Sequence, residues 1–458
     1  MNEAAPSIMD VMDKYVIIVD DQVWFILLFL LVGTGVFFSF RTGFVQVRRF
    51  KDAWNRVFGG LTLKGTKAGK DGMSSFQALA TAIAAQVGTG NIAGCSTALV
   101  KGGPGAIFWM WIAAFFGMAT IYGEAVLAQK YKTRDEHGEV IGGPVYYISA
   151  AFKGGLGKFL TVFFALAIIF ALGFMGNMVQ SNSISDAFNS AFGVPTWIMG
   201  LIVAAISAFI FLGGISRIAS FTEKVVPIMA CLYLIGGVVL LVMNISRLPC
   251  AIASIFVGAF SPQAVSGAMM GITVRQAIRY GVARGLFSNE AGMGSTPHAH
   301  AMANVDKPEE QGEVAMIGVF IDTFIVLNMT ALVVLSSGIL DSMIENGITG
   351  TRVAQEAFSK GLGAFGPKFV ALCLLFFAFS TIIGWYFFAQ QNVKYLLGNK
   401  AVRPFAVIVV ICVMIGALLK VDLVWDLSDL FNGLMVIPNL LALLALSGVV
   451  AAAAHGKK

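Results

Sequence analysis

The segment QVGTGN (86–91) places two glycines and several polar side chains inside an otherwise apolar stretch. A glycine costs about 1 kcal/mol relative to alanine inside a helix, so a helix through this segment is prone to break. A broken helix exposes N–H groups that can bind a carboxylate, and carbonyl groups that can bind a cation. Close helix packing explains the glycines equally well, because Gly90 and Gly94 form a small-xxx-small pair.

A second segment, RGLFSNEAG (284–292), combines an ionisable residue with Ser, Asn and Gly in a similar apolar setting. A carboxylate within a membrane costs several kcal/mol unless it is paired or solvated, which makes Glu290 a candidate functional residue. Its carboxylate could hold a cation or pair with an arginine. We favour a structural role, in which it stabilises a broken helix.

Adjacent hydroxyl groups occur in a third segment, FSTIIGWY (379–386). Ser380 and Thr381 can bond to carbonyl groups of their own helix, which is common, or serve as oxygen ligands for sodium. Trp385 follows Thr381 by four residues and therefore lies on the same helix face, where it can form one wall of a small pocket.

The composition of the chain around these segments indicates a membrane protein. Apolar residues make up 57% of the 458 positions and charged residues only 12%. Residues 23–40 and 430–454 are uncharged runs of 18 and 25 residues. Each run is long enough to cross a hydrocarbon core of about 30 Å. The acidic N-terminal stretch lacks the basic start of a signal peptide, so we expect the mature chain to begin near Met1.

We predict an all-α polytopic fold with about eleven transmembrane helices. The predicted spans are 22–40, 74–99, 103–130, 156–182, 195–214, 221–245, 267–302, 313–340, 364–396, 402–420 and 427–452. The segments 144–152 and 351–361 are too short to span a bilayer and are predicted to be amphipathic surface helices.

Basic residues indicate the orientation, because cytoplasmic loops are rich in Lys and Arg. The loop 41–73 carries Arg41, Arg48, Arg49, Lys51, Arg56, Lys64, Lys67 and Lys70. We therefore expect the N-terminus outside and the C-terminus inside, in the inner (plasma) membrane of a prokaryote. Arg275, Arg279 and Arg284 run against this rule, because they fall on the outer side. Basic loops explain the net charge of +6, and we expect no nucleic-acid partner.

Ten spans remain after the first, and they divide into two sets of five. An odd number of spans per set makes the second set enter the membrane from the opposite side, which is the condition for an inverted repeat. The predicted division is 1–73 (tail, extra helix and basic loop), 74–246 (first repeat) and 247–458 (second repeat and C-terminal tail). Both candidate breaks fall in the first span of a repeat, which favours a binding site over close packing.

The segment GGPGAIFWMW (102–111), with Gly117 after it, resembles the signature of the alanine/glycine:cation symporter family. VGTGNIAG (87–94) and RGLFSNEAG (284–292) resemble that family too, and the likeness covers essentially the whole chain. Cys95 departs from the pattern, since a small aliphatic residue is more usual there. The resemblance implies a leucine-transporter-type fold, with one extra helix before two inverted five-helix repeats whose first helices are broken. It also implies sodium-coupled uptake of alanine or glycine by alternating access, and we expect the monomer to function alone.

Site residues follow from the same resemblance. One Na⁺ would lie between the second and ninth spans, on carbonyl groups of Ala84, Val87 and Phe377 and hydroxyl groups of Ser380 and Thr381. The implied substrate-binding set is Gly88, Thr89, Gly90, Gln180, Phe287, Ser288, Asn289, Thr381 and Trp385. The substrate carboxylate would meet the backbone at 88–90 and its ammonium group the segment 287–289, while Phe287 and Trp385 limit the pocket volume. Asn91 matches a position that helps form a second sodium site in relatives of the fold.

Three alternatives remain open on the residues alone. A proton-coupled carrier would need a basic side chain or a titrating carboxylate at the cation position, whereas the ninth span offers hydroxyl groups. A channel would show a pore-lining ring formed by oligomerisation. An enzyme would need a nucleophile with a positioned base, or a metal centre, and neither arrangement is evident.

The sequence also suggests locations and roles for four further ionisable residues. Glu124 is expected near the cytoplasmic end of the third span, where Lys130 and solvent accommodate it. Asp322 lies deeper, and we favour a structural hydrogen-bonding role over a proton or gating network. His298 and His300 are expected in a loop or at the membrane interface rather than at a metal.

Overall fold

Helices make up nearly all of the structure. The computed structural model describes residues 8–59, 72–136, 138–269, 271–419 and 422–456. Within these ranges, eight helical segments are long and apolar enough to cross a membrane, and two shorter apolar helices accompany them. A two-stranded antiparallel hairpin joins β1 (Thr133–Arg134) to β2 (Val140–Ile141). The predicted all-α polytopic class is therefore confirmed, while the count of eleven spans stays a prediction.

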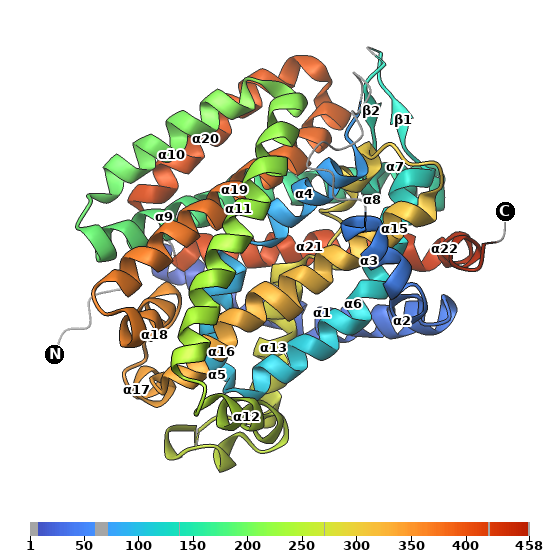
Figure 1. Ribbon diagram of the computed structural model, residues 1–458. Coiled ribbons are helices and arrows are strands. Elements are labelled where there is room, and N and C mark those ends of the chain that lie inside the picture. Colours follow the sequence, from blue (N-terminus) through green and yellow to red (C-terminus); the bar gives the residue numbers. More distant parts are fainter. Residues whose placement is uncertain (1–7, 60–71, 137, 270, 420–421, 457–458) are drawn as a thin grey trace.

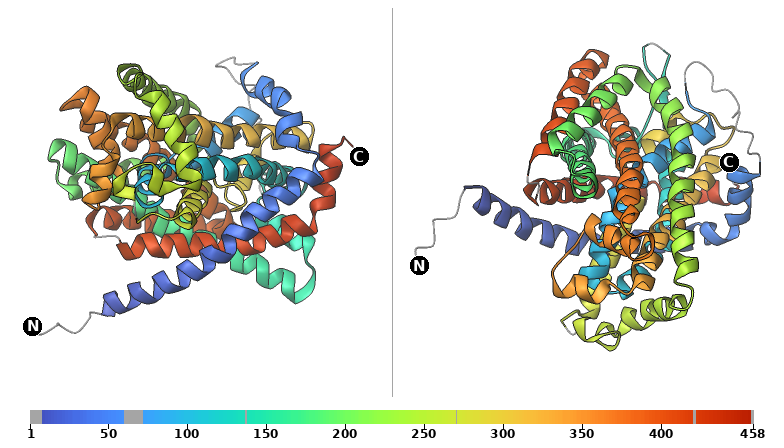
Figure 2. Two further views of the ribbon diagram at one scale, coloured as in Figure 1. Left: turned by 90° about the horizontal axis from the view of Figure 1, so that it is seen from below. Right: turned by 60° about the vertical axis from the view of Figure 1, so that its left-hand side comes forward.

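The helices run between two distinct ends of the molecule (Figures 1 and 2). We call one the hairpin end, where β1, β2, α2 (Val45–Arg48), α3 (Phe50–Phe58) and α22 (Ser447–Ala454) lie. The other is the α12 end, where α12 (Leu248–Phe260), α17 (Leu340–Glu345) and α18 (Thr351–Leu362) lie. Of the basic residues predicted in the loop 41–73, Lys64, Lys67 and Lys70 fall outside the described residues.

After α1 (Ile8–Arg41), the first predicted repeat contains ten described helical elements. They are α4 (Ser75–Gln86), a π-helical turn η1 (Gly90–Gly94), α5 (Cys95–Gly102), α6 (Gly105–Lys130), α7 (Pro144–Ala151), α8 (Gly154–Ile168) with its π-helical continuation η2 (Ile169–Gly176), α9 (Asn177–Phe192), α10 (Thr196–Phe211) and α11 (Gly214–Met243).

The region of the second predicted repeat begins with α12 and two short 3₁₀ turns, η3 (Pro262–Ala264) and η4 (Gly267–Met269). The remaining elements are α13 (Val274–Asn289), α14 (Pro297–Met302), α15 (Pro308–Val319), the π-helical η5 (Phe320–Leu327), α16 (Asn328–Ser337), α17, α18, α19 (Phe365–Leu397), η6 (Asn399–Ala401), α20 (Val402–Leu418), α21 (Asp422–Ala445) and α22.

Both predicted breaks are present in the structure. The first separates α4 from η1, and Val87 after α4 has an extended backbone with φ −82° and ψ 91°. The second separates α13 from α14, and Glu290 after α13 adopts a left-handed conformation with φ 57°. Two helices that each stop within the bundle leave unpaired backbone groups, which must find partners in the loops or in a ligand.

The two broken helices also begin alike. Ser74 and Gln77 form a capping box at the start of α4, with both bonds at 3.1 Å. Thr273 and Gln276 form the same box at the start of α13, at 2.8 and 3.3 Å. Each box satisfies N–H groups that the first turn of the helix leaves unpaired. Equivalent elements in the two predicted repeats also contact each other, as α10 and α20 do side by side (Figure 1).

Two details of the fold differ from the expectations. The helix α12 was not predicted, because an apolar segment of 13 residues is too short to span and carries no periodic polar face. The segment 144–152 is not a surface helix, since Val145, Tyr147 and Ile148 of α7 are buried. For α18 the amphipathic pattern is confirmed, with Val353 and Phe358 buried on one face and Arg352 exposed on the other.

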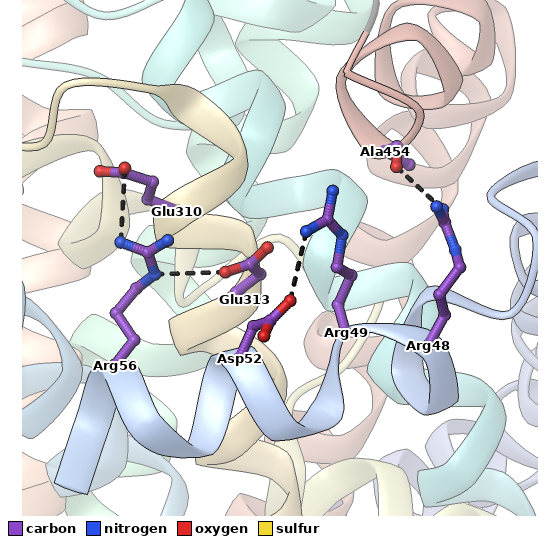
Figure 3. A network of polar contacts seen from close by, with 7 residues as sticks. All are labelled: Arg48, Arg49, Asp52, Arg56, Glu310, Glu313 and Ala454. Carbon is purple, nitrogen blue, oxygen red and sulfur yellow. Dashed lines mark hydrogen bonds and ion pairs between the residues drawn. The ribbon is translucent and has the colours of Figure 1, made fainter. Parts of the chain in front are cut away.

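Basic side chains tie α2 and α3 to the hairpin end of the bundle (Figure 3). Arg56 on α3 reaches two carboxylates of α15, Glu310 at 3.3 Å and Glu313 at 3.2 Å. Arg48 donates to the carbonyl oxygen of Ala454 at 2.8 Å, which links α2 to α22. The aromatic rings of Trp54 on α3 and Phe320 on η5 lie edge to face with centroids 6.2 Å apart.

We expect Arg56→Gln to lower the stability of the chain only slightly, because the arginine side chain is 40% exposed. Partly exposed ion pairs contribute about 0–1 kcal/mol. Thermal unfolding of the purified chain should shift by a few degrees at most, and less in high salt. A much larger shift, insensitive to salt, would show that the aromatic contacts of α3 depend on this ion pair.

Candidate functional site

The five residues predicted to hold a cation lie together where α4 ends against α19. The Thr381 hydroxyl donates to carbonyl oxygens of Ala84 at 3.0 Å and Phe377 at 3.0 Å, and lies 3.4 Å from that of Val87. The Ser380 hydroxyl lies 3.3 Å from the Ala84 oxygen and 2.9 Å from that of Phe377. All five residues are buried. The Ser380 and Thr381 hydroxyls bond to a carbonyl group of their own helix and also face the end of α4. The geometry is thus compatible with both interpretations of these hydroxyls, as partners of their own helix and as ligands of a cation.

Glycine at position 88 permits this close approach. A Cβ atom there would lie 2.3 Å from the Thr381 hydroxyl oxygen, which is shorter than any real contact of a side chain. At Gly90, a Cβ atom would lie 3.2 Å from the Cα of Ser288, so this glycine brings η1 against α13. The segment VGTGN therefore joins the two broken helices and α19 at one place.

Amide side chains accept hydrogen bonds from backbone N–H groups at the first break. Gly88 donates its N–H to the Asn91 side-chain oxygen at 2.9 Å. Thr89 donates its N–H to the Gln180 side-chain oxygen, from α9, at 3.3 Å. The hydroxyl of Thr89 is fully buried and has no hydrogen-bond partner among the described residues. Several other buried hydroxyls in the described part of the chain also lack a partner, but the Thr89 hydroxyl lies at the helix break, where a polar ligand or water can complete its bonding.

Two aromatic rings form a wall beside the second break. Phe287 and Trp385 meet edge to face with centroids 6.2 Å apart, and both are buried. The Trp385 indole donates to one carboxylate oxygen of Glu290 at 2.5 Å, and Ser295 donates to the other at 2.5 Å. Glu290 therefore fixes both the indole and the loop after α13. This arrangement is the structural role expected for its carboxylate.

Gly176 on η2 brings a further segment against this wall. A Cβ atom at that position would lie 2.6 Å from the Trp385 ring, so any other residue would clash with the indole.

A hydrogen-bond network around Asp322 on η5 connects three segments. Its carboxylate accepts hydrogen bonds from Asn91 at 2.6 Å, Ser288 at 3.0 Å and Thr323 at 3.0 Å. Asn289 donates to the hydroxyl of Thr323 at 3.1 Å. The structural role favoured for Asp322 agrees with these contacts. The side chains of Asn91 and Asn289 are thereby engaged within the protein, and Asn289 is directed to η5 rather than to the segment 88–90.

Glu124 differs from its expectation, because its side chain is completely buried. Its carboxylate accepts N–H groups of Gly292 at 3.0 Å and Gly294 at 2.9 Å, and the Asn439 amide at 2.7 Å. Both glycines have left-handed backbones, with φ 86° and 81°. Solvent and Lys130 thus do not accommodate the charge. Glu124 holds the loop between α13 and α14, a contact between distant segments that no local pattern in the sequence reveals.

The histidines were also misplaced by the sequence interpretation. His298 and His300 lie on α14 and are buried, so they are neither in a loop nor at an interface. His298 bonds to the Ser295 carbonyl at 2.7 Å and to Asn392 at 2.9 Å, and His300 bonds to Gln311 at 2.8 Å. No group of three or more potential metal-binding side chains occurs among the described residues. Both histidines connect α14 to neighbouring helices.

Paired breaks in two membrane helices, facing each other at the centre of a helix bundle, define a secondary transporter with a leucine-transporter-type fold. A solved structure with this fold is MhsT in complex with L-phenylalanine, with a TM-score of 0.57. It is 13% identical, and the match covers 84% of this chain and 99% of that one. At that identity the likeness concerns the fold alone.

The chain belongs to the sodium:alanine symporter family, whose model matches residues 9–456. It is 45% identical to the sodium/alanine symporter AgcS of Methanococcus maripaludis, over 93% of this chain and 92% of that protein. It is 38% identical to the amino-acid carrier protein AlsT of Bacillus subtilis, over 94% of this chain and 88% of that one. The expectation of a multi-pass membrane transporter rather than an enzyme is confirmed.

Proposed function

We propose that this chain carries alanine, and glycine with it, into the cell together with Na⁺ by alternating access. The main support is the convergence of carbonyl and hydroxyl oxygens of Ala84, Val87, Phe377, Ser380 and Thr381 at the end of α4. Carbonyl groups at an unwound helix end suit a hard monovalent cation. Because the same helix break continues into the segment 88–90, cation and substrate share one element.

The substrate binds beside this cation. Its carboxylate takes the N–H groups of Gly88, Thr89 and Gly90, displacing the amide oxygens of Asn91 and Gln180 that hold two of them in this structure. The buried hydroxyl of Thr89, which has no partner among the described residues, supplies a further polar contact. The ammonium group faces the carbonyl and hydroxyl oxygens of 287–289. A second sodium at Asn91 would bind the side-chain oxygen that also accepts the Gly88 N–H, while the amide nitrogen donates to Asp322.

The protein works as a monomer in the inner membrane of a prokaryote, with the hairpin end in the cytoplasm. The exposed basic residues Arg41 and Arg48 and the half-buried Arg49 at the hairpin end support this orientation. The N-terminus is then outside and the C-terminus inside. The division into an extra helix and two inverted repeats is supported by the equivalent capping boxes at Ser74 and Thr273.

Selectivity for small side chains follows from the aromatic wall. We expect Phe287→Ala to admit longer amino acids such as valine, because the lost ring leaves room at the edge of Trp385. One methyl or methylene group in an apolar pocket is worth about 1–3 kcal/mol, so the preference for alanine over valine should fall about tenfold or more. Competition of unlabelled valine against labelled alanine measures this preference. An unchanged preference in a folded, active variant would place the selective wall elsewhere.

Uptake of labelled alanine into proteoliposomes tests the function directly. We expect an inward sodium gradient to drive accumulation, and a pH gradient without sodium to drive none. Accumulation on the pH gradient alone would favour a proton-coupled carrier of the same fold. If neither gradient drives alanine accumulation by folded protein, alanine is not the substrate.

A further inference from the structure

A surface that is both apolar and basic lies at the hairpin end, where the extra helix α1 passes into α2. Phe40, near the end of α1, is 69% exposed, and Val47 on α2 is 61% exposed. Each of them is followed in the sequence by an exposed arginine, Arg41 and Arg48 respectively. Lys51, in the first turn of α3, is exposed as well. We call these five residues the α1–α2 corner.

A tight turn supports the apolar part of the corner. Gly43 and Phe44 both have left-handed backbones, with φ 64° and 52°. Glycine adopts this conformation readily, whereas phenylalanine adopts it only at a cost in free energy. The Phe44 N–H donates to the Ser39 carbonyl oxygen at 2.6 Å, and the Phe44 ring meets Phe40 edge to face with centroids 5.0 Å apart. The turn therefore keeps an aromatic pair at the surface, next to Arg41.

The positive charges of the corner have no carboxylate bound to them. The ion pairs in the described part of the chain do not include Arg41, Arg48 or Lys51. Their neighbours Arg49 and Arg56 do pair with carboxylates (Figure 3). The corner therefore combines three positive charges with apolar side chains whose exposure to water is unfavourable.

Arg48 is also held in position against the turn. One of its guanidinium nitrogens donates to the carbonyl oxygens of Thr42 at 2.9 Å and Ala454 at 2.8 Å. A guanidinium group has five N–H donors, so others remain for an anion. Because the side chain is already fixed, little further conformational entropy is lost when it binds a ligand.

We propose that the α1–α2 corner binds anionic phospholipids of the adjoining membrane leaflet. Its two apolar side chains contact the acyl chains, and its three cations bind the phosphate groups. Cations flanked by exposed aromatic and aliphatic side chains are typical of segments that lie in the headgroup layer of a membrane. The corner begins at the end of the apolar span Gln22–Arg41, which places it at the depth of the headgroups.

A lipid fits this surface better than a soluble anion does. A free phosphate ion would use the cations but would leave Phe40 and Val47 exposed to water. The corner is also continuous with an apolar side of α1, because Phe29 and Phe37 are 69% and 41% exposed and recur with Phe40 at helical spacing. Only the assignment to the cytoplasmic leaflet rests on the orientation proposed above, and lipid binding itself does not depend on transport.

Native mass spectrometry of the full-length chain in detergent tests the proposal. Titration with phosphatidylglycerol, and with phosphatidylcholine of the same acyl chains, gives an affinity for each lipid. We expect phosphatidylglycerol to bind more tightly. The triple variant Arg41→Gln, Arg48→Gln, Lys51→Gln should weaken phosphatidylglycerol binding by about fivefold for each charge removed. The same variant should leave the affinity for phosphatidylcholine unchanged.

A charge-matched control removes three exposed cations far from the corner, as Arg275→Gln, Arg352→Gln, Lys360→Gln. This control variant should retain the tight binding of phosphatidylglycerol. Size-exclusion profiles and thermal unfolding show whether both variants are folded.

Photolabelling of the unmodified chain decides the question if the first variant misfolds. The chain is placed in vesicles of phosphatidylglycerol and phosphatidylcholine, with a trace of either lipid carrying a photoreactive group beside its phosphate. We expect the phosphatidylglycerol probe to label peptides from residues 40–51 severalfold more than the phosphatidylcholine probe does.

Four results would overturn the proposal. Equal affinities for the two lipids, or an equal loss in both triple variants, would show that the corner does not select an anionic headgroup. Labelling by the phosphatidylglycerol probe that avoids residues 40–51 would place the lipid elsewhere. Displacement of the lipid by an equal concentration of glycerol 3-phosphate, which has no acyl chains, would identify a soluble anion as the occupant. A dimer that only the first triple variant converts to a monomer would assign the surface to a second copy of the chain.

Discussion

Replacing Thr381 by valine should strongly weaken the apparent sodium affinity of alanine uptake while the chain stays folded. Valine keeps the shape of threonine but removes one of the oxygens at the end of α4. Loss of one partner from a buried polar site costs about 1–3 kcal/mol, which is about five- to 150-fold in apparent sodium affinity. Uptake at fixed alanine and increasing sodium measures this affinity.

A threonine whose hydroxyl bonds only to a carbonyl group of its own helix provides the control. The Thr161 hydroxyl is buried on α8 and donates to the carbonyl oxygen of Gly157 at 2.7 Å. We expect Thr161→Val to leave the sodium dependence of uptake unchanged. An unchanged sodium affinity in Thr381→Val would move the cation away from the junction of α4 with α19.

Removing the buried carboxylate of Glu124 should have the largest effect on stability. Glu124→Ala leaves two backbone N–H groups, of Gly292 and Gly294, and one N–H of the Asn439 amide without their acceptor. The amide nitrogen keeps its bond to the Gly292 carbonyl oxygen. Each unsatisfied buried group costs about 1–3 kcal/mol. We therefore expect a drop in Tm of many degrees and loss of uptake, because the loop between α13 and α14 loses its anchor.

Two further variants make this prediction specific. Glu124→Gln keeps one acceptor oxygen and should recover part of the Tm. Glu345→Ala removes an exposed carboxylate on α17 and should change neither Tm nor uptake. A Glu124→Ala chain as stable as the unmodified one would mean that other groups hold the loop.

The breaks in the helices were predictable because their causes lie within short segments. Glycines beside polar residues in 86–91 and 284–292 interrupt apolar stretches, and the structure has a break at each. Thr381 and Trp385 lie where α19 passes these breaks, as their spacing on one helix face suggested. Local composition determines where a membrane helix can end, since few residue types tolerate that position.

The remaining contacts depend on which helices become neighbours. Glu124 meets Gly292 and Gly294 because α6 packs on the second break, and nothing near Glu124 in the sequence indicates this partner. His298 and His300 were expected in a loop or at the membrane interface, yet they are buried on α14. The same holds for the ion pair between Arg284 and Asp429, whose members are 145 positions apart.

The basic residues of α13 also acquire an explanation from the structure. Arg275, Arg279 and Arg284 run against the distribution expected for the proposed orientation. In the structure, Arg279 and Arg284 line a cavity beside Phe287, and Arg275 lies over the ring of Phe25 on α1. Specific contacts to the extra helix and to α21 thus account for positive charge at the α12 end.

Calorimetric titration of the purified chain with alanine at increasing sodium concentrations tests the central claim most directly. If sodium orders the end of α4 and so prepares the N–H groups of 88–90, alanine affinity rises with sodium. By thermodynamic linkage, alanine must then raise the sodium affinity by the same factor. Alanine affinity that does not change with sodium would contradict a shared helix break as the basis of coupling.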